Sequence, residues 1–184
     1  MINRTTPSDE GASPWTSHDA LDAESFKALA RKWASTVTVV TGRHSDQSLD
    51  GFTATAFLTV SMSPPIVLVS ATQSTRAGSM ARACEAFTIN LLREDQAAIA
   101  EQFARAGQER SDAFERFAHE RDPLGAAVLH GALGAFSCTR RQLVDAGDHV
   151  ILLADVTRIW VARDDASALL YADRAFRRVG DAVK

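Results

Sequence analysis

Hydroxyl-bearing residues recur at nearly every second position within one stretch, Asp50 to Pro65 (DGFTATAFLTVSMSPP). Such alternation predicts a β-strand that ends at Pro64 and Pro65. Two interpretations stay open: a half-exposed sheet that uses threonine for its β propensity, or a face that binds a polar ligand. One face would carry Thr53, Thr55, Phe57, Thr59 and Ser61, and the other Ala54, Ala56, Leu58 and Val60.

A second candidate site is the polar loop Thr72 to Arg76 (TQSTR), which precedes a predicted helix from Ala77 to Glu85. Two hydroxyls, the Arg76 guanidinium and the free N–H groups of a helix N-terminus would together bind an anion such as phosphate. A plain helix cap explains the same residues. The sequence of the loop does not decide between the two.

His149 lies between a tight turn, residues 145–148, and a strongly apolar strand. By itself this pattern favours a histidine that caps the turn and packs against the sheet. Asn90, in the predicted strand AFTINLL, is interpreted as a structural residue. Arg140 and Arg141 are interpreted as part of a solvated or interface face.

The sequence contains no GxSxG, HExxH, P-loop or GxGxxG motif. Cys84 and Cys138 are far apart in apolar surroundings and are predicted to be small buried hydrophobic residues. A hydrolase, a metal site and a Rossmann dinucleotide site are therefore disfavoured. What remains is an enzyme whose cofactor carries the chemistry, such as hydride transfer to a flavin, for which the protein supplies hydrogen bonds and an anion site.

The chain of 184 residues is predicted to form one domain, residues 19–184, after a disordered tail, residues 1–18. Hydrophobic residues make up 46%, and the net charge of -3 gives no basic field that would gather nucleic acid. The N-terminus lacks the apolar run of a signal peptide, and apolar runs are strand-sized. A cytoplasmic protein that binds neither membrane nor nucleic acid is expected.

Short β-branched runs dominate the rest of the chain. Strands are predicted at 36–41, 66–71 (buried on both faces), 86–92, 133–143, 150–161 and 169–171, and helices at 22–33, 77–85, 94–106 and 111–117. Residues 42–51 are predicted to be a hairpin loop ending in Asp50-Gly51, and residues 122–131 another loop. This pattern, without βαβ regularity, predicts a mainly antiparallel small barrel or open sheet with short helices.

The order of these elements resembles the short-chain flavin reductases, the FMN-binding split-barrel family that includes the reductase partners of two-component monooxygenases. The resemblance covers about residues 24 to 179 and depends on order and spacing more than on any one motif. The matching segments are STVTVVTG, DGFTATAFLTVSMSPPIVLVS, FTINLLREDQAAIAEQFA, FSCT, AGDHVILLADV and ALLYADRAFRRV.

The resemblance implies a split-barrel homodimer with FMN or FAD near the interface and NADH or NADPH as hydride donor. Residues that would line the flavin are Thr53, Ala54, Thr55, Ala56, Leu58, Thr59, Ser70, Ala71, Thr72, Phe103 and Ala104. Ser74 and Arg76 would hold the phosphate, and His149 would meet the nicotinamide with Tyr171 closing over it. Arg174 stands where the family usually has glycine, which either disturbs the nicotinamide contacts or brings Arg174 into them.

The function implied is an NAD(P)H:flavin oxidoreductase that supplies reduced flavin to a flavin-dependent monooxygenase. Alternatives are a flavin carrier or sensor without turnover, or another split-barrel enzyme such as an oxidase or a haem-handling protein. A purely structural β-domain is disfavoured by the hydroxyl face and the TQSTR loop.

Overall fold

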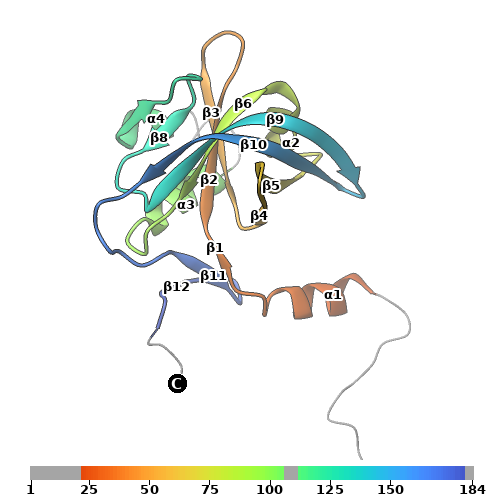
Figure 1. Ribbon diagram of the computed structural model, residues 1–184. Helices are drawn as coiled ribbons and strands as arrows, with labels where there is room; N and C mark the ends of the chain where they lie inside the picture. Colours follow the sequence, from red (N-terminus) through yellow and green to blue (C-terminus); the bar gives the residue numbers. More distant parts are fainter. Residues whose placement is uncertain (1–21, 106–111, 181–184) are drawn as a thin grey trace, which may run out of the picture.

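The computed structural model describes residues 22–105 and 112–180 (Figure 1). Within these residues one antiparallel sheet has the strand order β3-β2-β6-β9-β10-β5-β4. The fold is the expected split barrel. The strands of this sheet are β2 (Thr38–Arg43), β3 (Leu49–Ala54), β4 (Phe57–Met62), β5 (Pro65–Thr72), β6 (Ala86–Leu91), β9 (Gly134–Ala146) and β10 (His149–Val161).

Shorter elements surround this sheet. A small sheet has the order β1-β11-β12, and β7 pairs with β8. The short strands are β1 (Ser35–Thr36), β7 (His119–Arg121), β8 (Ala127–Leu129), β11 (Leu170–Ala172) and β12 (Ala175–Arg177). The helices are α1 (Ala23–Ala30), α2 (Arg76–Ala83), α3 (Ala97–Ala104) and α4 (Ala113–Arg116).

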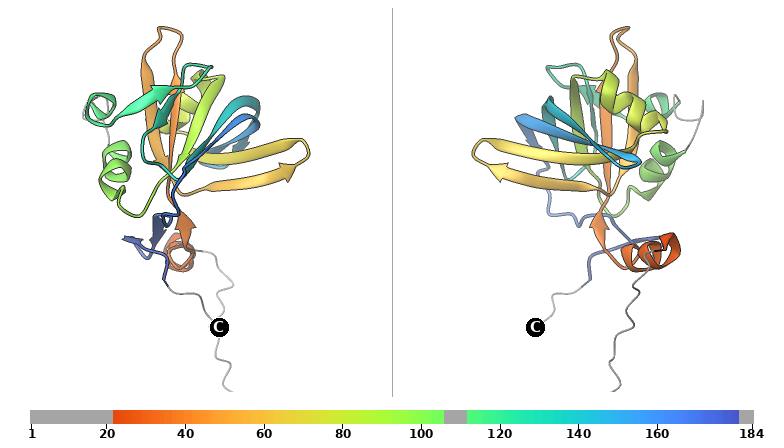
Figure 2. Two further views of the ribbon diagram at one scale, coloured as in Figure 1. Left: turned by 60° about the vertical axis from the view of Figure 1, so that its left-hand side comes forward. Right: turned by 90° about the vertical axis from the view of Figure 1, so that its right-hand side faces the viewer.

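The barrel is split between two strands that are consecutive in the chain. β3 and β4 occupy opposite edges of the sheet, so the chain crosses from one edge to the other at Thr55 and Ala56. The two further views show the β4–β5 hairpin projecting away from β2 and β3 (Figure 2). This crossing is where the candidate site forms.

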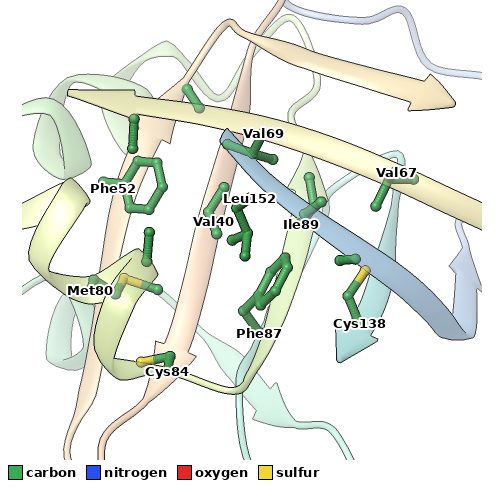
Figure 3. Packing of buried hydrophobic residues seen from close by; sticks show 14 of the residues in the cluster. Val40, Phe52, Val67, Val69, Met80, Cys84, Phe87, Ile89, Cys138 and Leu152 are labelled. Atoms are coloured by element: carbon green, nitrogen blue, oxygen red, sulfur yellow. The ribbon is translucent and has the colours of Figure 1, made fainter. Parts of the chain in front are cut away.

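Apolar side chains from the strands fill the barrel interior, where Val40, Phe52, Val69, Ile89 and Leu152 pack together (Figure 3). Helix α2 packs against this cluster through Met80 and Ala81, and Cys84 follows directly after the helix. A second cluster under α3 includes the fully buried Phe103. Both clusters hold the backbone around the split in place.

Both cysteines are buried. Burial raises the pKa of the Cys84 thiol to about 11 and that of the Cys138 thiol to about 12. Because the thiolate is the reactive form of cysteine, these are inert core residues, as predicted.

The predicted single strand from Thr53 to Ser61 is wrong. The alternation continues through a break at Thr55 and Ala56, and β4 pairs with β5 whereas β3 pairs with β2. The hydroxyl groups therefore do not share one face. Strand β5 was expected to be buried on both faces, but only alternate residues are buried.

Asp50-Gly51 is not the hairpin turn that the sequence suggested, because both residues belong to β3. The β2–β3 turn lies nearer residues 44–48, where the His44 amide donates to the Ser48 carbonyl. Glycine is needed at position 51 for packing, since a Cβ there would lie 2.8 Å from the Phe103 ring. The predicted loop 122–131 contains β8, which also differs from expectation.

Helix α1 begins after Asp22, whose carboxylate accepts hydrogen bonds from the amides of Glu24 and Ser25. It ends at Ala30, three residues earlier than predicted. Its apolar residues are exposed: Phe26 by 72%, Leu29 by 77%, and Trp33 just beyond by 78%. The predicted tail, residues 1–18, lies outside the described residues. Among the described helices, none is long and apolar enough to span a membrane.

Candidate functional site

A cavity of about 320 Å³ lies at the split of the barrel, where the β3–β4 connection faces the end of β5. Ten residues predicted for the flavin and nicotinamide site meet here, although they come from four separate segments. The lining residues are Phe52, Thr53, Ala54, Thr55, Ala56, Ser70, Ala71, Thr72, Thr75, Ala77, Phe103, Ala104 and His149.

Small side chains and polar backbone form the wall of this cavity. Thr55 and Ala56 lie between the last pair of the β2–β3 ladder and the first pair of the β4–β5 ladder. The Ala56 carbonyl accepts a hydrogen bond from the Ser70 amide at 3.0 Å. The Thr53 hydroxyl donates to the Ala100 carbonyl of α3 at 2.6 Å, so this hydroxyl ties the wall to α3. The result is a shallow, alanine-rich surface suited to a flat ring.

The loop between β5 and α2 forms one end of the cavity. Thr75 is the N-cap residue of α2, but its hydroxyl donates a hydrogen bond to the Thr72 carbonyl at 2.8 Å. It does not accept a hydrogen bond from an amide of the first turn of the helix, as a capping side chain would. The helix N-terminus therefore stays open beside the exposed Ser74 and the half-exposed Arg76. These are the donor groups that bind phosphate at helix N-termini.

Asp50 orients Arg76 and was not singled out from the sequence. Its carboxylate, 4% exposed, accepts from Arg76 Nε at 2.9 Å and from the Gly51 amide at 2.7 Å. His44 Nε2 lies 3.3 Å from Asp50 Oδ2, the carboxylate oxygen that also accepts from Arg76. A buried carboxylate needs partners of this kind. The sequence pattern predicts a turn at Asp50-Gly51 and carries no signal for this role.

His149 is held from both sides of its ring. Its Nε2 lies 3.2 Å from the Thr72 hydroxyl, and its Nδ1 lies 2.7 Å from Asp148 Oδ1. The hydrogen bond and the charge of His149 lower the pKa of the exposed Asp148 carboxyl below its usual value. Nδ1 therefore faces the Asp148 carboxylate, and Nε2 faces Thr72 at the cavity.

Two larger cavities, of about 560 and 540 Å³, continue the site into one groove. Thr55 lines all three cavities, and Tyr171 and Arg174 line both larger ones. The Tyr171 ring stands edge-on to Phe176 at 5.5 Å between centroids. Arg174 lies in the β11–β12 turn with a φ of 62°, a conformation that favours glycine.

Some predicted residues lie elsewhere. Leu58 and Thr59 are exposed on β4 and do not line the three cavities. Ser74 and Arg76 do not line them either, but lie beside Thr75 and Ala77, which do. Asn90 is structural, as predicted, because its amide bonds the backbone of Val39, Ala127 and Leu129. Arg140 donates to the carbonyls that end α2, and Arg141 pairs with Asp155.

The donor set and the space fit a flavin nucleotide. An open helix N-terminus with Arg76 suits its phosphate, and the alanine-rich wall suits its ring. The adjoining cavities leave room beyond the wall for a second ligand. Pockets for cofactors are typically concave, mostly apolar and provided with a few fixed polar groups, as here.

Comparison with known proteins agrees with this geometry. The family described as "Flavin reductase like domain" matches residues 30–180, and the chain belongs to this family. The chain is 36% identical over 149 residues to the actinorhodin polyketide dimerase of Streptomyces coelicolor, with 81% of each chain covered. It is 34% identical over 187 residues to an NADH:FMN oxidoreductase of Rhodococcus qingshengii, covering 97% of this chain and 93% of that protein.

A third relative is the reductase component of 4-hydroxyphenylacetate 3-monooxygenase from Thermus thermophilus, 31% identical over 156 residues and covering 85% of this chain and 96% of that protein. Among solved structures, the NADH:FAD oxidoreductase SgcE6 of Streptomyces globisporus superposes with a TM-score of 0.81 at 26% identity. That match covers 94% of this chain and 96% of the other.

Proposed function

We propose that this protein is an NAD(P)H:flavin oxidoreductase that reduces FMN or FAD. The observation that carries the proposal is a single groove with an anion site at the α2 N-terminus and a fixed histidine beside it. A bound flavin supplies hydride chemistry, since its ring accepts a hydride from reduced nicotinamide. The relatives named as NADH:FMN and NADH:FAD oxidoreductases support this assignment.

The protein's part is binding and alignment. Ser74, Arg76 and the first amides of α2 hold the flavin phosphate, and Asp50 keeps Arg76 aimed at it. The wall from Thr53 to Ala56, with Ser70, Ala71 and Thr72 beside it, positions the ring and excludes water from one side. Fixing two reactants in register removes much of the entropic barrier to their reaction.

His149 faces the nicotinamide in this proposal. Its Nε2 and the Thr72 hydroxyl present polar groups to the cavity, suited to the amide of the nicotinamide ring. Tyr171 and Arg174 line the opposite part of the groove, where the remainder of the nucleotide lies. No proton has to be taken up or released by His149 for hydride transfer.

The natural acceptor of the reduced flavin is a flavin-dependent monooxygenase in the cytoplasm, where reduced nicotinamide is supplied. The relative that is a monooxygenase reductase component supports this partner.

The working unit is a homodimer in this proposal. Helix α1 exposes Phe26 and Leu29, the segment just after it exposes Trp33, and β4 exposes Leu58 and Met62. Large exposed apolar side chains of this kind are typical of a protein interface. Because Trp33 also lines the groove, a second copy that covers α1 would close the site.

The test measures loss of absorbance at 340 nm with purified protein, NADH or NADPH, and FMN, FAD or riboflavin. Flavin-dependent oxidation of the nicotinamide is expected. Arg76→Ala should weaken FMN binding about tenfold by removing a charge-assisted hydrogen bond, and His149→Ala should lower kcat/KM for NADH about tenfold. The matched controls, Arg163→Ala and His130→Ala, change residues outside the groove and should leave both parameters unchanged.

Flavin binding without nicotinamide oxidation would overturn the reductase proposal in favour of a flavin carrier. That alternative has one specific observation behind it, the unusual arginine at position 174 inside the groove. Failure of both binding and turnover would leave only the fold in common with the family.

A further inference from the structure

Gln73 ties the β5–α2 loop to the turn that carries His149. Its side-chain Nε2 donates to the His149 carbonyl at 2.9 Å and to the Gly147 carbonyl at 3.2 Å. Its backbone N–H donates to the Asp148 carbonyl at 2.9 Å. One residue therefore bonds three consecutive residues that lie more than seventy positions later in the chain.

The β5–α2 loop, which contains Gln73, is itself packed tightly against helix α2. A Cβ at Gly78 would lie 2.6 Å from the Thr72 carbonyl oxygen and 2.7 Å from the Gln73 carbonyl oxygen. The first turn of the helix thus contacts the loop backbone directly. In addition, Arg82 of α2 donates to Gln73 Oε1 at 3.1 Å. Gln73 therefore accepts a hydrogen bond from α2 through its Oε1 atom and donates hydrogen bonds to the turn through its Nε2 atom.

Other ties join the turn to this loop. Arg82 pairs with Asp145, but both side chains are exposed to solvent, and exposed ion pairs contribute little. His149 begins β10, where it is in register with Thr72 of β5, and its Nε2 contacts the Thr72 hydroxyl. Gly147 and Asp148, which precede β10, are bonded to the loop through Gln73. The amide of Gln73 is half-buried and donates to two carbonyls, so its loss removes two hydrogen bonds between the loop and the turn.

We propose that Gln73 is a positioning residue: it locks the β9–β10 turn to the anion-binding loop, so that His149 keeps a fixed place relative to the flavin phosphate site. The inference rests on the proposed function, in which His149 meets nicotinamide and the loop holds flavin. Gln73 acts through His149 and touches neither ligand. The flavin phosphate keeps its own anchor, the Asp50–Arg76 pair, which is independent of Gln73.

The first readout needs no flavin and no turnover. In the flavin-free protein, Gln73→Ala should speed amide hydrogen exchange at residues 145–149 and at position 73 about tenfold, because hydrogen bonds that close the turn are lost. Gln73→Glu keeps the length and the acceptor for Arg82 but cannot donate to the two carbonyls, so it should have at least the same effect. Gln142→Ala on the exposed part of β9 is the matched control and should not change exchange there.

The second readout is a double-mutant cycle on NADH oxidation with FMN. Gln73→Ala should raise the KM for NADH or lower kcat about tenfold in the otherwise unchanged protein, while the FMN dissociation constant stays within about twofold. In the His149→Ala protein the same substitution should change the NADH parameters less than about twofold. Equal losses in both backgrounds, or unchanged exchange at the turn, would overturn the inference.

The two proposals fail in different ways. If His149→Ala leaves the NADH parameters unchanged while exchange at the turn is fast in Gln73→Ala, the role given to His149 is wrong and the structural lock stands. If His149→Ala is harmful while Gln73→Ala and Gln73→Glu are neutral in both readouts, the role given to Gln73 is wrong and the proposed function stands.

Discussion

The two ends of the groove are built in different ways. At the anion end, a buried carboxylate, a half-buried amide and a histidine bonded on both nitrogens fix the β5–α2 loop and its neighbouring turn. At the opposite end, helix α1 and the β11–β12 hairpin supply exposed side chains. Trp33 is 78% exposed there, and Arg174 occupies a left-handed backbone conformation.

The difference shows which part of the site one chain can complete. Buried hydrogen-bonded networks hold groups in place without help, because breaking them leaves polar atoms unsatisfied. Exposed apolar side chains on a short helix hold little by themselves. The anion end is therefore preformed, whereas the end at α1 and the β11–β12 hairpin, here called the open end, would be completed by the second copy of the chain that we propose.

The largest expected effect comes from placing a charge on the open end. Trp33→Asp would put a carboxylate into the apolar face of the proposed dimer, and a charge buried there without a partner is costly. We expect monomers at micromolar concentration and a loss of reductase activity of more than about tenfold. Sedimentation velocity and the 340 nm assay measure the two changes. A monomeric variant with full activity would mean that the open end needs no partner.

A smaller effect is expected at the anion end from Asp50→Asn. The substitution removes the charge that faces Arg76, and we expect a loss of about 2–3 kcal/mol in the free energy of unfolding. FMN should bind about tenfold more weakly because Arg76 is no longer aimed, whereas riboflavin, which has no phosphate, should bind as before. Urea denaturation and fluorescence titration measure these values.

The matched control is Asp173→Asn at the open end, where an exposed carboxylate pairs with Lys32 at 3.0 Å. No measurable change in stability is expected, since exposed pairs contribute little. Equal losses for the two variants would contradict the distinction between a preformed and an open end.

The sequence predicted more of the elements than of the contacts between them. Strand runs, helix α1 and the buried cysteines follow from local patterns. The break at Thr55 does not, because the alternation continues through it and only the placement of β3 and β4 at opposite sheet edges reveals it. The roles of Asp50 and Gln73 depend on partners 26 and 76 positions away, which no local pattern specifies.

The smallest expected effect tests the backbone of the open end. Arg174 has a φ of 62°, and an L-residue in that region costs about 1 kcal/mol relative to glycine. Arg174→Gly should therefore raise the free energy of unfolding by up to about 1 kcal/mol, or Tm by about 2–4 °C for a chain of this size. Calorimetry measures this change. The neighbouring Asp173→Gly is the matched control, and a smaller gain is expected because aspartate tolerates this conformation better.

The same variant also separates strain from function. If Arg174 takes part in binding the nicotinamide nucleotide, the stabilised Arg174→Gly protein will show a raised KM for NADH or NADPH, with FMN binding unchanged. Such a result would mean that the chain keeps a strained arginine at this turn because its guanidinium contacts the nucleotide. Stabilisation without any change in KM would mean that Arg174 does not contact the nucleotide and that the anion end alone recognises it. The anion end would then be both the preformed end and the end that binds the ligands.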